Sequence, residues 1–168
     1  MNKKVHYRYN VEGENEKSLL EVLKRDLQCI EAGKIEIFNA VKDKLTPMRI
    51  RTFKSNKVVV LVYDTDVEKV DILKENIKFL QKQKCIKDII CIPQVNNLED
   101  ELKRSCDVKN VLEITRSTSQ KEFKSDFNKC TNLSNRLLEC HFNIDLMWKI
   151  TPSNTFKQFE NQSNKIKL

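Results

Sequence analysis

The sequence predicts an α/β fold with a mostly parallel central sheet of about four strands and helices on both faces. Short apolar runs typical of strands alternate along residues 5–106 with segments whose apolar residues recur at helical spacing. One run, residues 57–63, contains five consecutive aliphatic residues, as expected of a central strand covered on both faces. Strands and helices that alternate in this way form parallel sheets. A chain of 168 residues is long enough for one domain.

The first part of the chain predicts a strand, a helix and a second strand. Residues 5–11 combine β-branched and aromatic side chains without glycine or proline, which is typical of a strand. A helix is expected to begin at Asn15 or Glu16, and Gly33 is expected to end it. Residues 35–38 then form a short strand. The helix has one apolar face, made by Leu19, Leu20, Leu23, Leu27 and Ile30.

The middle of the chain predicts an irregular segment, the buried central strand and a second helix. Pro47 prevents one long helix through residues 40–56, so we expect a short helix or an irregular excursion there. After the central strand, Thr65 and Glu68 match a capping box. The helix that follows is expected to end near Gln83.

A last strand and helix complete the expected core. Residues 89–92 are an apolar run typical of a buried strand, and Pro93 is expected to end it. Asn97, with Asp100 three residues later, then marks a helix start. We therefore expect an α/β core over residues 1–106.

Residues 107–168 predict a helical C-terminal extension packed on the same domain. Ser119 and Glu122 match the cap of one helix, and apolar residues within 133–140 indicate another. Residues 161–168 carry no clear pattern, and we expect them to be frayed.

Composition and charge narrow the classes of function. No apolar stretch approaches the roughly 18 residues of a membrane span, and no signal-peptide pattern follows the first residues, so we expect a cytoplasmic protein without membrane partners. The six cysteines are irregularly spaced and include no C-x-x-C pair, so they are expected to be reduced and mostly buried. With only two histidines, a zinc site built from cysteine and histidine is not expected.

Two acidic motifs follow two of the predicted strands. Residues 5–11 lead into Glu12-Gly13-Glu14-Asn15-Glu16, and residues 57–63 lead into Asp64-Thr65-Asp66. In a parallel sheet the ligand site lies at the carboxyl ends of the strands. Asp64 and Asp66 can both reach one Mg²⁺ there, and Glu12 could complete the site or move a proton. Glu16 lies about one helical turn after Glu12 and can face the same pocket.

Each motif alone has a simpler explanation. Acidic residues are favoured at helix starts, where they cap the helix and complement its dipole. A D-x-D pair is also common by chance. The joint pattern, a glutamate-glycine motif and a D-x-D motif that each end a strand, favours a shared metal site.

With these two motifs, residues 5–106 resemble the Toprim domain of topoisomerases, bacterial primases, ribosomal-RNA maturases and OLD-family nucleases. Val11-Glu12-Gly13 is similar to the glutamate motif of that family, and Asp64-Thr65-Asp66 to its D-x-D motif. The E-G-x-x-E spacing of Glu12 and Glu16 resembles the OLD-like group. The resemblance implies a Rossmann-like Toprim fold, in which these acids bind divalent metal or transfer protons at a phosphodiester.

The resemblance also implies two later site residues. OLD-like sites use an acidic residue after the fourth strand, for which Glu99 is the candidate and Asp100 the competitor. They also use a later lysine, for which Lys121 is the candidate and Lys124 the competitor. An acidic first turn that stabilises a helix dipole, and solvated helix lysines, are the alternative explanations.

A basic stretch offers a binding surface for nucleic acid. Residues 42–57 contain six basic residues and one acid, in a chain of net charge +7. Such a stretch suits phosphate backbones, although a solvated loop in a lysine-rich protein explains it equally well. The six basic residues are Lys42, Lys44, Arg49, Arg51, Lys54 and Lys57.

The expected function is that of a metal-dependent nuclease. Glu12, Asp64, Asp66 and Glu99 are the expected ligands of Mg²⁺ or Mn²⁺, and Glu12, Glu16 and Lys121 the expected catalytic residues. DNA and RNA remain equally open as substrates, and the OLD-like resemblance implies a role in phage defence, mobile-element biology or nucleic-acid processing. The alternative is a non-catalytic module that binds metal or a nucleotide and acts with a protein partner from a neighbouring gene. A receiver-like or glycosyltransferase-like use of D-x-D is a third, weaker possibility.

Overall fold

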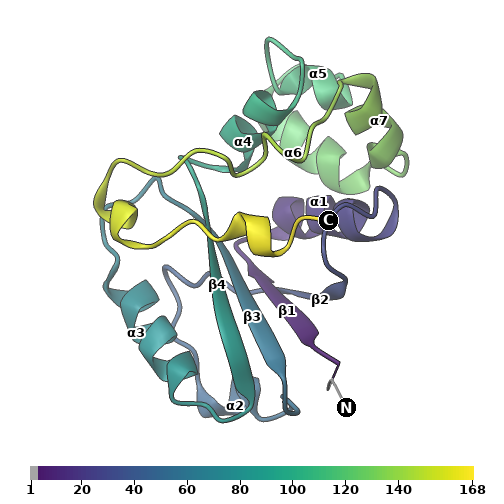
Figure 1. Cartoon of the computed structure of the whole chain (residues 1–168). Coiled ribbons are helices and arrows are strands. Elements are labelled where there is room, and N and C mark those ends of the chain that lie inside the picture. The colour runs from purple at the N-terminus through teal and green to yellow at the C-terminus, as the bar shows by residue number, and fades with distance from the viewer. Residues whose placement is uncertain (1–3) are drawn as a thin grey trace.

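Four parallel strands in the order β2-β1-β3-β4 form the centre of the computed structural model, which describes residues 4–168 (Figure 1). Helices cover both faces of this sheet, so the predicted Rossmann-like α/β fold is confirmed. The strands are β1 (His6–Val11), β2 (Gly33–Ile37), β3 (Lys57–Asp64) and β4 (Ile86–Gln94).

The helices divide between the sheet and a cluster beyond the carboxyl ends of its strands (Figure 1). They are α1 (Glu14–Arg25), α2 (Pro47–Ile50), α3 (Asp71–Gln81), α4 (Leu98–Ser105), α5 (Leu112–Thr115), α6 (Gln120–Lys129) and α7 (Leu133–Glu139), with 3₁₀ turns η1 (Thr155–Gln158) and η2 (Ser163–Lys165). Within residues 4–168, none of these helices has the length and apolar character that crossing a membrane requires.

The central strand β3 builds both halves of the core. Val58, Val60 and Val62 point to the face covered by α1, and the side chains of Val59 and Leu61 point to the face covered by α3. All of these side chains are nearly inaccessible to solvent. The unbroken aliphatic run of the sequence therefore reflects a strand that is buried on both sides.

The chain reverses its direction of travel across the sheet between β1 and β3. From β1 it passes through α1 to β2 on one side, and from β3 it passes through α3 to β4 on the other. The carboxyl ends of β1 and β3 are therefore the switch point at which ligands bind in open α/β sheets.

Gly33 does not end a helix, as the sequence had suggested. Helix α1 ends at Arg25, and Gly33 is instead the first residue of β2, paired with Tyr7. A Cβ atom at Gly33 would lie 2.7 Å from the carbonyl oxygen of Tyr7. Glycine is therefore required here by the close approach of the two strands.

The capping box expected at Thr65 and Glu68 is also absent, and α3 begins later, at Asp71. The Thr65 hydroxyl donates to the carbonyl of Gln94 and accepts from the N–H of Asn96. It thereby joins the loops that follow β3 and β4. The expected caps Asn97 and Ser119 are confirmed, since each accepts a hydrogen bond from a backbone N–H three residues later.

Pro93 does not end β4, which continues to Gln94. β4 is an edge strand, and the N–H of Cys91 points outward, to the side chain of Gln162. Pro93 has the same parity as Cys91, so the N–H it lacks would also have pointed away from β3. The proline therefore removes no hydrogen bond of the sheet.

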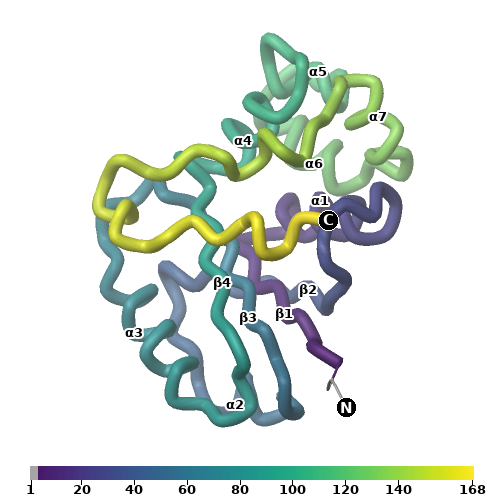
Figure 2. The backbone as a smooth tube through the Cα atoms, in the orientation of Figure 1, coloured from purple at the N-terminus to yellow at the C-terminus, as the bar shows by residue number. Residues whose placement is uncertain are grey.

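The last residues of the chain are folded against the core, so the expectation of a frayed end was wrong. Phe156 packs on the α3 face, the N–H of Gln162 donates to the carbonyl of Cys91 at the β4 edge, and Ile166 packs on the α1 face. The segment thus wraps around the edge of β4 (Figure 2). An antiparallel bridge between Ile30 and Lys167 fixes its end.

Truncating Ile166 is expected to destabilise the fold. Its side chain is 0% exposed, and removal of a buried isoleucine side chain down to alanine typically costs about 2–5 kcal/mol. Ile166→Ala should therefore lower the urea midpoint, whereas Leu168→Ala, at a residue that is 71% exposed, should not. Equal midpoints for the two variants would show that the C-terminal segment does not pack as described.

Candidate functional site

Glu12 and Asp64 meet at the switch point of the sheet. Glu12 directly follows β1, and Asp64 is the last residue of the adjacent strand β3. The backbone N–H of Asp64 donates to Glu12 Oε2 at 3.2 Å. The parallel pairing of β1 and β3 therefore brings two of the predicted site carboxylates together.

Glu16 is the third acid of this group. It lies in the first turn of α1 and is only 7% exposed. A Cβ atom at Gly13 would lie 3.3 Å from Glu16 Oε2, so the glycine leaves room for the carboxylate beside the turn. Burial raises the pKa of Glu16, and the charges of Glu12 and Glu99 raise it further.

The strongest electrostatic effect falls on Asp64. Burial, followed by the charges of Glu12 and Glu16, raises the pKa of Asp64 to about 8, and Asp66 adds a smaller contribution. The pKa values of two buried carboxylates, Glu16 and Asp64, are thus raised partly by neighbouring acids at the switch point, and a cation would be favoured at such a site. We call Glu12, Glu16 and Asp64 the acidic triad.

Gln94 holds Asp64 from the neighbouring strand. The register of β3 and β4 pairs Asp64 with Gln94, and Gln94 Nε2 donates to Asp64 Oδ1 at 2.7 Å. The amide of Gln94 is itself held, because Trp148 Nε1 donates to Gln94 Oε1 at 3.3 Å. Sequence reasoning missed Gln94, because the strand was expected to end before it.

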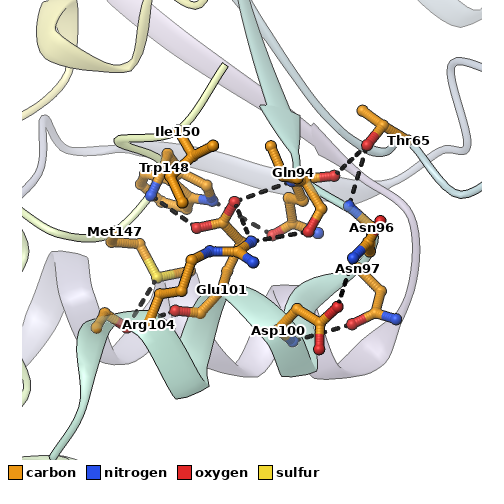
Figure 3. Close-up of polar contacts among 12 residues, drawn as sticks. Thr65, Gln94, Asn96, Asn97, Asp100, Glu101, Arg104, Met147, Trp148 and Ile150 are labelled. Atoms are coloured by element: carbon orange, nitrogen blue, oxygen red, sulfur yellow. Dashed lines mark hydrogen bonds and ion pairs between the residues drawn. The ribbon is translucent and has the colours of Figure 1, made fainter. Parts of the chain in front are cut away.

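A buried glutamate, Glu101, lies close to Gln94 and Trp148 (Figure 3). Glu101 on α4 is 0% exposed and accepts hydrogen bonds from the backbone N–H groups of Val95 and Trp148. Arg104 lies 2.9 Å from Glu101 Oε1 and also donates to the carbonyl of Val95. Glu101 thus ties the end of β4 to the C-terminal segment that carries Trp148.

The remaining acidic candidates lie at the rim of the site. Asp66 is exposed, beyond the end of β3. Glu99 is near enough to raise the pKa of Glu16, whereas Asp100 accepts from Asn96 and belongs to the capping turn of α4. Of these two competitors, Glu99 is the one whose charge acts on a residue of the acidic triad.

Of the two candidate lysines, Lys124 is the one that contacts a residue near the site. Lys124 Nζ lies 3.6 Å from Glu99 Oε1, and the side-chain amide of Asn15 donates to the carbonyl of Lys124. Lys121 is exposed on α6. The structure therefore places Lys124 beside the site and shows no such contact for Lys121.

The six residues of the predicted basic stretch lie in different environments. Lys57 begins β3 and is 8% exposed, about 23 Å of strand away from Asp64 at the other end. Lys44 forms an ion pair with Glu75 on α3, and Arg49 donates to the carbonyl of Ile37 at the edge of the sheet. Lys42, Arg51 and Lys54 are exposed.

Comparison with protein-family models, curated proteins and solved structures found no match. The resemblance to the Toprim family therefore rests on the two acidic motifs and stays a hypothesis. Among residues 4–168, no three or more histidine, cysteine, aspartate or glutamate residues are arranged so that they could hold a metal ion. The six cysteines are free, and Cys91 and Cys106 are the buried ones.

Proposed function

We propose that this protein is a metal-dependent nuclease that hydrolyses phosphodiester bonds. The observation that carries the proposal is the acidic triad, gathered from two neighbouring strand ends and the first turn of α1 at the switch point of a parallel sheet. The chain around it has a net charge of +7, which suits a polyanionic substrate. The resemblance of the two motifs to the Toprim family supports the same reaction.

The donor atoms suit a hard divalent cation, Mg²⁺ or Mn²⁺. Glu12 and Asp64 would hold it, with Asp66 and Glu99 at the rim. Mg²⁺ is commonly held by one or two carboxylates, with water and substrate phosphate as the other ligands, so a group of three protein ligands is not required. A bound cation supplies positive charge that polarises the scissile phosphate.

The chain's own residues supply orientation and proton transfer. Gln94 fixes one oxygen of Asp64, so that the other carboxylate oxygen can face the substrate. Glu16 is suited to accept the proton of an attacking water, because burial raises its pKa and so makes its carboxylate a stronger base. Lys124 carries a positive charge beside Glu99, where it can contact the phosphate chain.

A non-catalytic module that binds metal or a nucleotide is the second candidate function. Its nucleotide-binding form needs no metal site, which suits the finding that no three metal-binding side chains are preassembled among residues 4–168. Such a module would act with a protein partner. A role in phage defence and a partner from a neighbouring gene remain predictions from the resemblance for either function.

Cleavage assays distinguish the two functions. Purified protein is incubated with labelled single- and double-stranded DNA and RNA, with Mg²⁺, Mn²⁺ or EDTA. We expect metal-dependent cleavage, and we expect Glu12→Gln, which removes a charged ligand of the cation, to cut about 100-fold more slowly. Glu160→Gln, at an exposed residue on the C-terminal segment, is the matched control.

Cleavage by Glu12→Gln at the rate of the control would contradict the proposal. Metal binding without cleavage of any of the four substrates would support the non-catalytic module instead.

A further inference from the structure

The outer edge of β2 carries a cluster of cations next to the acidic triad. A pocket of 420 Å³ at β2 is lined by Lys17, Lys34 and Arg49, with Glu36 as its acidic residue. Its other lining residues are Ile35 and Ile37 of the same strand. The pocket therefore lies along an edge strand and has an excess of positive charge.

The cations approach this edge from both sides of the sheet. Lys17 belongs to α1, which packs on one face, and Arg49 belongs to α2, whose Ile50 packs in the core of the other face. Arg49 is held in place, because it donates to the carbonyl of Ile37 at 2.8 Å and lies 4.4 Å from the centroid of the Phe38 ring. A guanidinium fixed in this way is ordered before any ligand binds.

The acidic residue does not cancel this charge. Glu36 Oε1 lies 3.1 Å from Arg8 and 2.7 Å from Lys34, so one carboxylate is shared between two cations. Together with Lys17 and Arg49, the edge keeps a net positive charge. Anionic groups of a ligand would therefore be attracted to it.

The edge is continuous with the acidic triad. Ile37 pairs with Val11, the residue before Glu12, and the N–H of Phe38 donates to the carbonyl of Val11 at 2.8 Å. Lys17 directly follows Glu16 on α1. Glu12 therefore lies one strand spacing of about 4.8 Å from β2 and Asp64 about two, so a polyanion bound at the triad would extend to the β2 edge.

We propose that the β2 edge, through Lys17, Lys34 and Arg49, binds the sugar-phosphate backbone of a nucleic-acid strand beside the acidic triad. The inference rests on the proposed function for its choice of ligand. Contacts of this kind position the strand without reading its sequence, so affinity should be similar for different sequences and should fall with salt.

The test measures binding without cleavage. Fluorescence anisotropy in EDTA with fluorescein-labelled 20-mers compares the wild type with Lys17→Gln/Lys34→Gln. The control is Lys74→Gln/Lys78→Gln, which removes the same charge from exposed positions on α3. We expect the edge variant to bind on the order of tenfold more weakly, with a salt slope smaller by about one to two, and the control to bind like the wild type.

Equal weakening of both double variants would overturn the inference, because net charge alone would then explain binding. Unchanged binding by the edge variant, or no binding by the wild type, would also overturn it. The two proposals fail separately. Binding that depends on the edge, without cleavage, would contradict the nuclease proposal and support nucleic-acid binding at the β2 edge. Cleavage by the wild type, with normal binding by the edge variant, would support the nuclease proposal and contradict binding at the edge.

Discussion

Asp64→Asn is expected to make the protein more stable at pH 8 and to remove its response to Mg²⁺. Asp64 is held close to Glu12 and Glu16, and burial with their charges raises its pKa from 3.8 to about 8. The native state therefore keeps a proton on Asp64 that the unfolded chain releases above about pH 4. A neutral amide of the same shape avoids this cost, and its oxygen can still accept from Gln94.

The sign of the pH dependence follows from proton binding. Between about pH 4 and pH 8 the native state binds more protons at Asp64 than the unfolded state, so its stability falls as pH rises. The stability that comes from keeping this proton on Asp64 is fully present below about pH 4 and is lost once the pH exceeds about 8. Each pKa unit corresponds to about 1.4 kcal/mol, so Asp64→Asn should exceed the wild type in unfolding free energy at pH 8 by at least that amount.

Urea denaturation in EDTA at pH 5, 6, 7 and 8 measures this difference. The free energies of unfolding of wild type and Asp64→Asn should converge toward low pH and separate toward high pH. Asp107→Asn, at an exposed position outside the site, should follow the wild type throughout. Parallel curves for wild type and Asp64→Asn would show that Asp64 is not electrostatically strained.

Mg²⁺ should narrow the difference in stability between the wild type and Asp64→Asn. A cation held by Glu12 and Asp64 binds only the native state, and at ten times its dissociation constant it stabilises by about 1.4 kcal/mol. Wild type and Asp107→Asn should gain this amount at pH 8, and Asp64→Asn should not. If the wild type gains nothing with Mg²⁺ or Mn²⁺, the metal site is contradicted even where the pH dependence is as expected.

Local patterns in the sequence were sufficient for the core of the fold. The aliphatic run of β3 and the caps at Asn97 and Ser119 act within a few residues of themselves, so the chain alone carries the signal. Gly33 and Thr65 were misread because their roles depend on partners far away in the chain. Gly33 lies close to the backbone of Tyr7, and Thr65 forms hydrogen bonds with Gln94 and Asn96.

The same division holds for the candidate site. Glu12 and Asp64 could be placed together from the rule that parallel strands end along one edge. Gln94 could not, because its contact with Asp64 depends on the register of β3 and β4 and on a strand that continues past a proline. Trp148 lies 54 residues further along the chain from Gln94, and no local pattern indicates that contact.

Glu101→Ala is expected to cause the largest loss of stability. The variant would leave the part-buried N–H of Val95, the buried N–H of Trp148 and the guanidinium of Arg104 without their shared acceptor. Removing one partner of a buried charged pair typically costs about 3–5 kcal/mol. For a chain of this length the melting temperature should fall by about 10 °C.

The single tryptophan makes the loss visible at the place where it occurs. Trp148 is 0% exposed and donates to both Glu101 and Gln94, so its fluorescence reports directly on the contacts that Glu101→Ala removes. Glu160→Ala, at an exposed residue, should melt like the wild type. Glu101→Gln should fall between the two, because an amide oxygen can replace one acceptor but its NH₂ group faces the remaining donors. A Glu101→Ala protein that melts with the control would mean that this carboxylate does not join β4 to the C-terminal segment, and the support of Asp64 through Gln94 would then have to come from Trp148 alone.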